Sequence, residues 1–322
     1  MSEYKSCHLL EHGICFYPKN VCSCCYAPYE EDEFVPLIYS VSEYNGQKID
    51  KEYLFEKINN WRNDAKNGKY IKSCQECYQL KMGDFSEKNY INQVYITHFE
   101  ECNSNCIYCI NNLDNGERKK DTYKIIPILD DMREKGILKQ NCELHIGGGE
   151  FSIYPECTEI IEKYVLSGFS KFLAIATNGI VFSESIFKAM DLGKACIIIS
   201  IDSGSKKQYK KIKRVDAFDK LKKSLKEYTK TETARNNTFL KYIVLPKIND
   251  SKWEFKKFLG LAKKYKIKGI KIDIDGRYCR QNSFNPDKKV SKFLKWCVEY
   301  ANKKEFDVET FQFYNLCFQK TT

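Results

Sequence analysis

Apolar residues recur in short runs along most of the chain, and amphipathic segments separate these runs. Runs of strand length lie at 93–99, 143–148, 171–177, 195–202, 238–245 and 269–275. Segments with a helical spacing of apolar residues lie near 120–136, 155–167, 183–192, 205–229, 250–265 and 287–303. This alternation predicts an α/β protein with a parallel sheet and right-handed crossovers. Six strands are too few for a closed eight-stranded barrel.

The period-two pattern also assigns residues to the two faces of a strand. In 269–275 the isoleucines share one face, and Lys271, Asp273 and Asp275 share the other. The segment 195–202 has a similar pattern. As in the strands of a barrel, we expect the apolar faces to pack against outer helices and the polar faces to point into the barrel lumen. Charged groups in a lumen are costly unless they are paired or used, so the pattern predicts either an internal Lys271–Asp273 ion pair or, as we favour, substrate binding.

Composition narrows the class of protein. The chain has 322 residues, enough for one large domain and a small one. It has no apolar signal segment and no run near the ~18 apolar residues of a membrane span, so we expect a cytoplasmic protein without a membrane partner. The net charge is +10. The excess basic residues either lie on solvated helix surfaces or indicate a preference for an anionic substrate or partner. A nucleic acid is not expected, because no motif combines basic and aromatic residues in the required way.

Cysteines are abundant and unevenly placed: ten of the sixteen lie within the first 109 residues. Clustered thiols in a cytosolic protein favour metal ligation over disulfides. Cys102, Cys106 and Cys109 have a C-x₃-C-x₂-C spacing directly after the strand 93–99. A cubane normally takes four thiolates, so three closely spaced ligands would leave one iron open. A zinc site is the alternative, because sulfur ligands suit both metals.

The cysteine segment resembles the cluster loop of radical S-adenosylmethionine (radical SAM) enzymes. The resemblance implies a 4Fe–4S cluster on these three cysteines, SAM on the open iron, and Tyr108 close to the adenine. It also implies a partial (β/α)₆ barrel, here over 91–305, preceded by a small cysteine-rich cluster-binding domain and followed by a C-terminal extension at 306–322.

Further segments resemble weaker parts of the family pattern. Glycines allow close approach of a ligand to the backbone, and the Gly-Gly-Glu motif after the second strand contacts the methionyl amine in the family. The residues implied for SAM binding are Gly148, Gly149, Glu150, Thr177, Asn178, Ser200, Asp202 and Arg214. Lys213 stands beside Arg214, and Asn249 is a candidate for the adenosyl region.

The first 90 residues are predicted to form a separate unit with a hairpin around Asn20. This segment resembles the twitch domain, the short form of the SPASM domain, which implies a second, auxiliary 4Fe–4S cluster. The expected ligands are Cys7, Cys24, Cys74 and Cys77, with Cys25 or Cys15 as substitutes and Cys22 as an extra cysteine. A zinc site with the same ligands is the alternative.

The resemblance implies the chemistry. A flavodoxin or ferredoxin-type donor reduces the cluster, SAM is cleaved, and a 5′-deoxyadenosyl radical removes hydrogen from a substrate C–H bond. We favour an oxidoreductase that dehydrogenates a small polar or anionic metabolite, such as a sugar derivative, with the auxiliary cluster as electron acceptor. An epimerase is the alternative, with Cys279 either as hydrogen donor or as a structural residue. A modifier of peptides or proteins and a non-catalytic zinc or Fe–S scaffold are the other classes considered.

Overall fold

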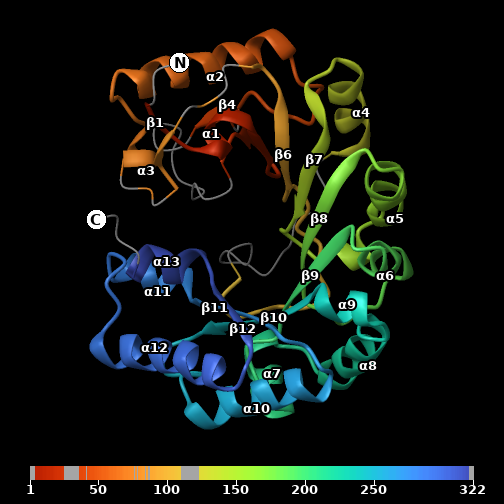
Figure 1. The fold of residues 1–322 in the computed structure, drawn as a ribbon, viewed down its shortest axis with the longest axis vertical. Helices are drawn as coiled ribbons and strands as arrows, with labels where there is room; N and C mark the ends of the chain where they lie inside the picture. Colours follow the sequence, from red (N-terminus) through yellow and green to blue (C-terminus); the bar gives the residue numbers. More distant parts are fainter. Residues whose placement is uncertain are drawn as a thin grey trace.

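The computed structural model describes residues 4–24, 36–40, 42–75, 77, 79–83, 85, 88–109 and 123–318. Its centre is a ten-stranded sheet with the order β12-β11-β10-β9-β8-β7-β6-β2-β3-β4 (Figure 1). The strands are β2 (Gly13–Phe16), β3 (Val21–Cys22), β4 (Leu37–Tyr39), β6 (Ile91–Ile96), β7 (Leu138–Ile146), β8 (Ser170–Thr177), β9 (Ala195–Ser200), β10 (Thr238–Val244), β11 (Gly269–Ile274) and β12 (Asp307–Thr310). All neighbours from β2 through β6 to β12 are parallel, and β3 is antiparallel to β2 and β4.

Helices connect the parallel strands and cover the outer face of the sheet (Figure 1). They are α4 (Ile126–Glu134), η2 (Phe151–Ile153), α5 (Cys157–Ile160), η3 (Ile161–Leu166), α6 (Glu184–Asp191), α7 (Lys206–Lys213), α8 (Phe218–Tyr228), α9 (Glu232–Asn236), α10 (Lys252–Lys264), α11 (Gly276–Gln281) and α12 (Lys288–Lys303). A last helix, α13 (Gln312–Phe318), follows β12, and its Tyr314 amide donates to Asp273 of β11 at 2.9 Å. One large apolar core joins them to the sheet, with Ile197, Tyr228 and Ile272 among its members. Across the described residues, no helix combines the length and the apolar character needed to span a bilayer.

The predicted α/β architecture is confirmed, and each of the six predicted strands overlaps an observed one. Two further parallel strands, β2 and β12, extend the sheet. The sequence does not reveal β12, because its Asp-Val-Glu-Thr run is short and three of its four residues are polar. The helix expected over 205–229 is two helices, because α7 ends at Arg214 with a left-handed backbone (φ 53°).

The two faces of the sheet differ in burial as the alternation predicts. On β8, Leu173 and Ile175 are fully buried, whereas Ala176 is exposed. On β9, Ile199 is fully buried and Ser200 is half-buried. The apolar face therefore packs under the helices, and the more polar face forms the inner side of the sheet.

Part of the N-terminal segment, β2 to β4, joins the main sheet, although the first 90 residues were predicted to form a separate unit. The predicted hairpin is confirmed, since β2 pairs antiparallel with β3 and the Tyr17 amide donates to the Asn20 carbonyl at 3.0 Å. However, β2 also pairs in parallel with β6. The physical reason is that Ile14 and Phe16 of β2 are fully buried in the same core as β6.

A smaller sheet and a buried ion pair organise the remaining N-terminal residues. The elements are β1 (Tyr4–Ser6), α1 (His8–His12), α2 (Lys51–Lys66), α3 (Lys72–Gln75) and β5 (Lys81–Gly83), with β1 antiparallel to β5. Arg62 Nε of α2 donates to Glu11 Oε2 of α1 at 2.6 Å, and both side chains are buried. The hydroxyls of Tyr4 and Ser6 donate to the second oxygen of Glu11, so this ion pair has the additional hydrogen bonds that buried charges need.

Candidate active site

The cysteine loop, residues 102–109, follows β6 and is attached to the end of α7. The Asn105 amide donates to the Lys213 carbonyl at 3.0 Å, and the Ile107 amide donates to the Ile212 carbonyl at 2.9 Å. These bonds satisfy two carbonyl groups that the last turn of a helix leaves without intrahelical partners. The loop is therefore held by backbone contacts at the edge of the sheet where the parallel strands end.

The three thiols of the loop are partly exposed and have polar neighbours. Ser104 Oγ lies 3.6 Å from Cys102 Sγ and 3.7 Å from Cys106 Sγ. Asn178 Nδ2, at the end of β8, lies 3.5 Å from Cys102 Sγ and donates to Asn103 Oδ1 at 2.6 Å. Three partly exposed thiols on one loop match in number and type the donor set that a 4Fe–4S cluster with a free iron position requires, and hydrogen bonds to sulfur are one means of tuning its potential.

The glycine motif after β7 packs directly against the residues that lead into this loop. The amide of Gly149 donates to the Phe99 carbonyl and that of Glu150 to the Glu101 carbonyl, both at 2.7 Å. A Cβ atom on Gly148 would lie 2.7 Å from the Phe99 carbonyl oxygen, and one on Gly149 would lie 2.2 Å from that of Glu101. These glycines are therefore required because two backbone segments touch, a reason that the sequence alone does not give.

Glu150 joins the ends of β7 and β8 through its buried carboxylate. It accepts hydrogen bonds from the Thr177 hydroxyl and from the Asn178 amide, each at 2.6 Å, and from the hydroxyl and amide of Ser152. Gly148, Gly149, Glu150, Thr177 and Asn178, all implied for SAM, thus lie together beside the cysteine loop. Their contact with SAM stays a prediction.

A buried network anchors Tyr108, the aromatic residue of the loop. The Tyr108 hydroxyl donates to Asp202 Oδ2, and Lys213 Nζ lies 2.5 Å from the same oxygen and 2.7 Å from the Tyr108 hydroxyl. Asp202 Oδ1 accepts from the Ile243 amide at 2.7 Å, and the side chains of Asp202 and Lys213 are almost fully buried. Asn249 braces the same corner, because its side-chain amide donates to the Asp202 carbonyl at 2.8 Å.

Burial and charge act together on this network. Burial, and after it the Asp202 carboxylate, raises the pKa of Tyr108 well above its usual range. Burial alone would lower the pKa of Lys213, but the Asp202 carboxylate outweighs it and raises that pKa. We therefore expect Lys213 to be charged and Tyr108 to be protonated at neutral pH.

The residues after β9 differ in their placement. Ser200 lies half-buried on the inner face. Arg214 is exposed at the end of α7, and the neighbouring Lys213 is the cation that reaches the loop. The phase of α7 turns residue 213 inward and residue 214 outward, and the role implied for Arg214 in SAM binding stays a prediction.

The polar residues of β11 lie on the inner face as predicted, but they do not pair with each other. Lys271 forms an ion pair with Glu309 of β12, and Asp273 lies 3.5 Å from Lys241 of β10. Burial is the main cause that raises the pKa of Asp273. Asp275 caps α11 and accepts from the Arg277 amide at 3.1 Å. Lys241 and Glu309 are two inner-face charges that sequence reasoning missed.

Cys279, for which the sequence left open a role as hydrogen donor or as structural residue, takes a buried position. It is fully buried in the main core, and the Cys317 thiol of α13 donates to its sulfur at 3.5 Å. The hydrogen bond to Cys317 and burial both raise the pKa of Cys279. The reason for its position is that α11 begins directly after β11 and places Cys279 beneath α13.

The structure brings the four expected N-terminal ligands into one apolar group. Cys7 and Cys74 are buried with leucine side chains, and Cys24 and Cys77 pack against them. Burial raises the pKa of Cys7, with a smaller contribution from Cys77, and burial also raises the pKa of Cys77. Cys25 lies outside the described residues.

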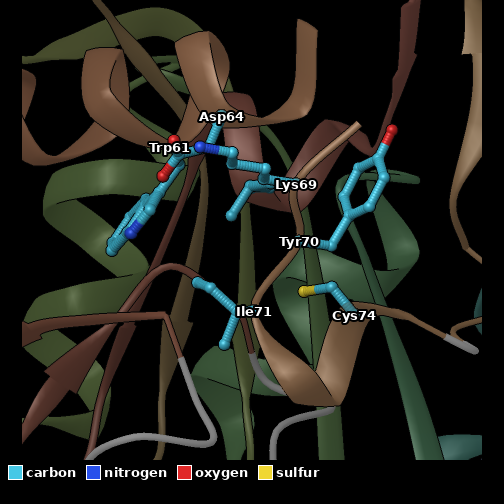
Figure 2. A pocket seen from close by; sticks show the side chains of 7 residues that line it. Trp61, Asp64, Lys69, Tyr70, Ile71 and Cys74 are labelled. Atoms are coloured by element: carbon cyan, nitrogen blue, oxygen red, sulfur yellow. The ribbon is translucent and has the colours of Figure 1, made fainter. Parts of the chain in front are cut away.

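Two features adjoin this group, which we call the N-terminal cysteine group. Cys15 and Cys22 face each other across the hairpin in a separate buried cluster. A pocket of about 220 Å³ lies on another side, and Figure 2 shows the Cys74 sulfur turned toward it, with Trp61, Lys69 and Ile71 around it. Within the described part of the chain, no three His, Cys, Asp or Glu side chains converge on a point that one metal ion could occupy.

Comparison with known proteins gives a family and several relatives. A family model described as "Radical SAM superfamily" matches residues 96–259. The probable GTP 3′,8-cyclase of Pyrococcus abyssi (strain GE5 / Orsay) is 30% identical over 176 residues, which make up 53% of each chain. The chain therefore spans about half the length of the curated relatives it matches.

Solved structures support the fold. Streptococcus suis SuiB bound to S-adenosylmethionine superposes with a TM-score of 0.53 and 14% identity, over 85% of this chain and 60% of that one. SuiB bound to the precursor peptide SuiA gives a TM-score of 0.52 and 11% identity, over 99% of this chain and 79% of that one. At these identities the similarity concerns the architecture alone.

Proposed function

The chain belongs to the radical SAM superfamily, and from this premise we propose that it oxidises a small anionic metabolite at the inner face of its partial barrel. The family implies a 4Fe–4S cluster and SAM. The observation that carries the proposal is the three-thiol loop at the strand ends, directly above an inner face with buried lysines.

The residues of the chain fit these two groups. Cys102, Cys106 and Cys109 would hold the cluster, which when bound supplies the electron that splits SAM for hydrogen abstraction. The Asp202–Lys213 pair fixes the loop through Tyr108. The strand-end residues Gly148 to Glu150, Thr177, Asn178 and Ser200 would bind SAM.

The N-terminal cysteine group supports oxidation as the outcome. We propose that Cys7, Cys24, Cys74 and Cys77 hold a second 4Fe–4S cluster that accepts an electron from the substrate radical. Support comes from their grouping in one cluster beside β6. Epimerisation is the weaker proposal, because its nominated donor, Cys279, is buried in the core. A flavodoxin or ferredoxin-type electron donor stays a prediction.

A nucleotide is a second candidate substrate, because several of the curated relatives are named GTP 3′,8-cyclase or probable GTP 3′,8-cyclase. The test is anaerobic turnover in deuterated water with reductant, SAM, and either GTP or a panel of phosphorylated and carboxylated sugars. A product two hydrogens lighter than its substrate supports oxidation. Deuterium incorporated at a product carbon would favour epimerisation, and a rearranged product from GTP would favour cyclisation.

A further inference from the structure

Two lysines lie side by side on the inner face of the sheet. Lys241 of β10 is in register with Lys271 of β11, and Ser200 of β9 is in register with Lys241. The side chains of Lys241 and Lys271 are only 14% and 10% exposed. Cross-strand neighbours of like charge repel, and partly desolvated ammonium groups are costly, so this arrangement requires negative charge nearby.

The carboxylates beside the two lysines neutralise the lysine charges only in part. The ion pair from Lys241 to Asp273 is long, at 3.5 Å. Asp273 Oδ1 is already used, because it accepts from the amides of Tyr314 and Ile274 at 2.9 and 3.0 Å. A lysine ammonium has three donors, so this single contact leaves donor capacity on Lys241.

The partner of Lys271 is a carboxylate that can leave. Glu309 forms the ion pair from the edge strand β12, and its side chain is 55% exposed. An exposed glutamate regains its hydration when it turns away from a lysine, so a competing anion displaces it at small cost.

Aromatic rings bring the two ammonium groups together. Lys241 Nζ lies 4.1 Å from the centre of the Phe311 ring, and Lys271 Nζ lies 5.8 Å from the same centre. Lys271 Nζ also lies 4.6 Å from the Phe239 ring centre. The rings hold the cations by cation–π attraction and provide no acceptor for their N–H groups.

The lysine pair lies just below the cysteine loop. Ile243, two residues after Lys241 on the same face, packs with Ile107 and Tyr108 of the loop. Two residues of a strand span roughly 7 Å. A molecule anchored at Lys241 therefore extends toward the loop where the radical chemistry begins.

We propose that Lys241 and Lys271 bind a compact oxyanion of the substrate, a phosphate or a carboxylate, in exchange for Glu309. The lysines act as point charges for the anion, and Asp273 keeps Lys241 in place while the site is empty. The assignment of this anion to the substrate rests on the proposed function; the anion site itself does not.

The test is calorimetric titration of the anaerobically purified protein, without SAM or reductant, at constant ionic strength. Titration with inorganic pyrophosphate tests whether the site binds phosphates, and titration with succinate tests whether it binds carboxylates. We expect one probe to bind, and Lys241→Met and Lys271→Met each to weaken it at least tenfold. Glu309→Gln removes the competing carboxylate and should tighten binding several-fold.

A double variant, Lys220→Met with Lys223→Met on the exposed side of α8, matches the lysine pair in charge and should bind as wild type. Equal binding by wild type and the Lys241→Met/Lys271→Met variant would overturn the site, as would weaker binding by Glu309→Gln. The titration of Glu309→Gln still tests the site if a lysine variant misfolds, because the Glu309 side chain is exposed. If the anion binds in this titration but the anaerobic turnover with SAM and reductant yields no 5′-deoxyadenosine, the proposed function fails and the anion site stands.

Discussion

The cysteine loop and the N-terminal cysteine group present thiols in opposite surroundings. Around Cys102 and Cys106 the structure places the Ser104 hydroxyl, with the Asn178 amide beside Cys102, and the thiols are partly exposed. Around Cys7 and Cys74 it places leucines, and burial raises the pKa of Cys7. Under the proposed function, the polar, partly exposed surroundings would suit a cluster that binds a second molecule, and the apolar surroundings would suit one that only exchanges electrons.

The largest expected effect separates the two regions by function. Changing Cys102, Cys106 and Cys109 to Ala should abolish 5′-deoxyadenosine formation and lower the iron content from about eight to about four per chain, because each 4Fe–4S cluster needs its thiolates. Chromatography of the nucleoside products and iron and sulfide analysis measure both. Residual 5′-deoxyadenosine in this variant would contradict the assignment of the loop.

The reciprocal change should spare SAM cleavage. Cys74→Ala with Cys77→Ala removes two thiols of the N-terminal cysteine group, so we expect about four irons, continued 5′-deoxyadenosine formation and loss of the oxidised product. The control is Cys297→Ala, which removes a buried core cysteine of α12. This variant should retain about eight irons per chain and still form the oxidised product. If the double variant retains eight irons, the group does not hold a cluster.

A third prediction concerns the buried Asp202–Lys213 pair that supports the loop through Tyr108. Lys213→Met leaves the buried Asp202 carboxylate without its cation, and breaking a buried pair in this way costs about 3–5 kcal/mol of unfolding free energy. Denaturant melts measure the loss. Asp202→Asn combined with Lys213→Met should recover part of it, and an unchanged stability of the single variant would show that the network is not structural.

The prediction with the smallest expected effect concerns the close contact between the backbone at Gly149 and the backbone at Glu101. Gly149→Ala places a Cβ atom 2.2 Å from the Glu101 carbonyl oxygen, so we expect a loss of about 1–3 kcal/mol and lower iron occupancy of the loop, with the N-terminal group unaffected. Gly260→Ala is the matched control, because no atom lies within 4 Å of its Cβ and the position is helical. It should be neutral or slightly stabilising. Equal iron occupancy in both variants would contradict the packing argument.

Local sequence patterns were sufficient to predict much of the fold and the cysteine loop of this protein. The spacing of Cys102, Cys106 and Cys109 and the run of alternating strands and helices are short-range properties, so the sequence alone predicted the loop, the parallel sheet and the superfamily. The N-terminal hairpin was predicted for the same reason, since its turn is set by adjacent residues.

Tertiary structure decided how distant segments meet. That β2 lies beside β6, that Lys213 rather than Arg214 reaches Tyr108, and that Lys241, Lys271 and Glu309 share one face all depend on strand order and helix phase. Period-two alternation assigns a residue to a face but does not say which strand lies next to it. The sequence therefore predicted which residues of the loop would carry its chemistry, and only the folded sheet specified which charges face one another beneath it.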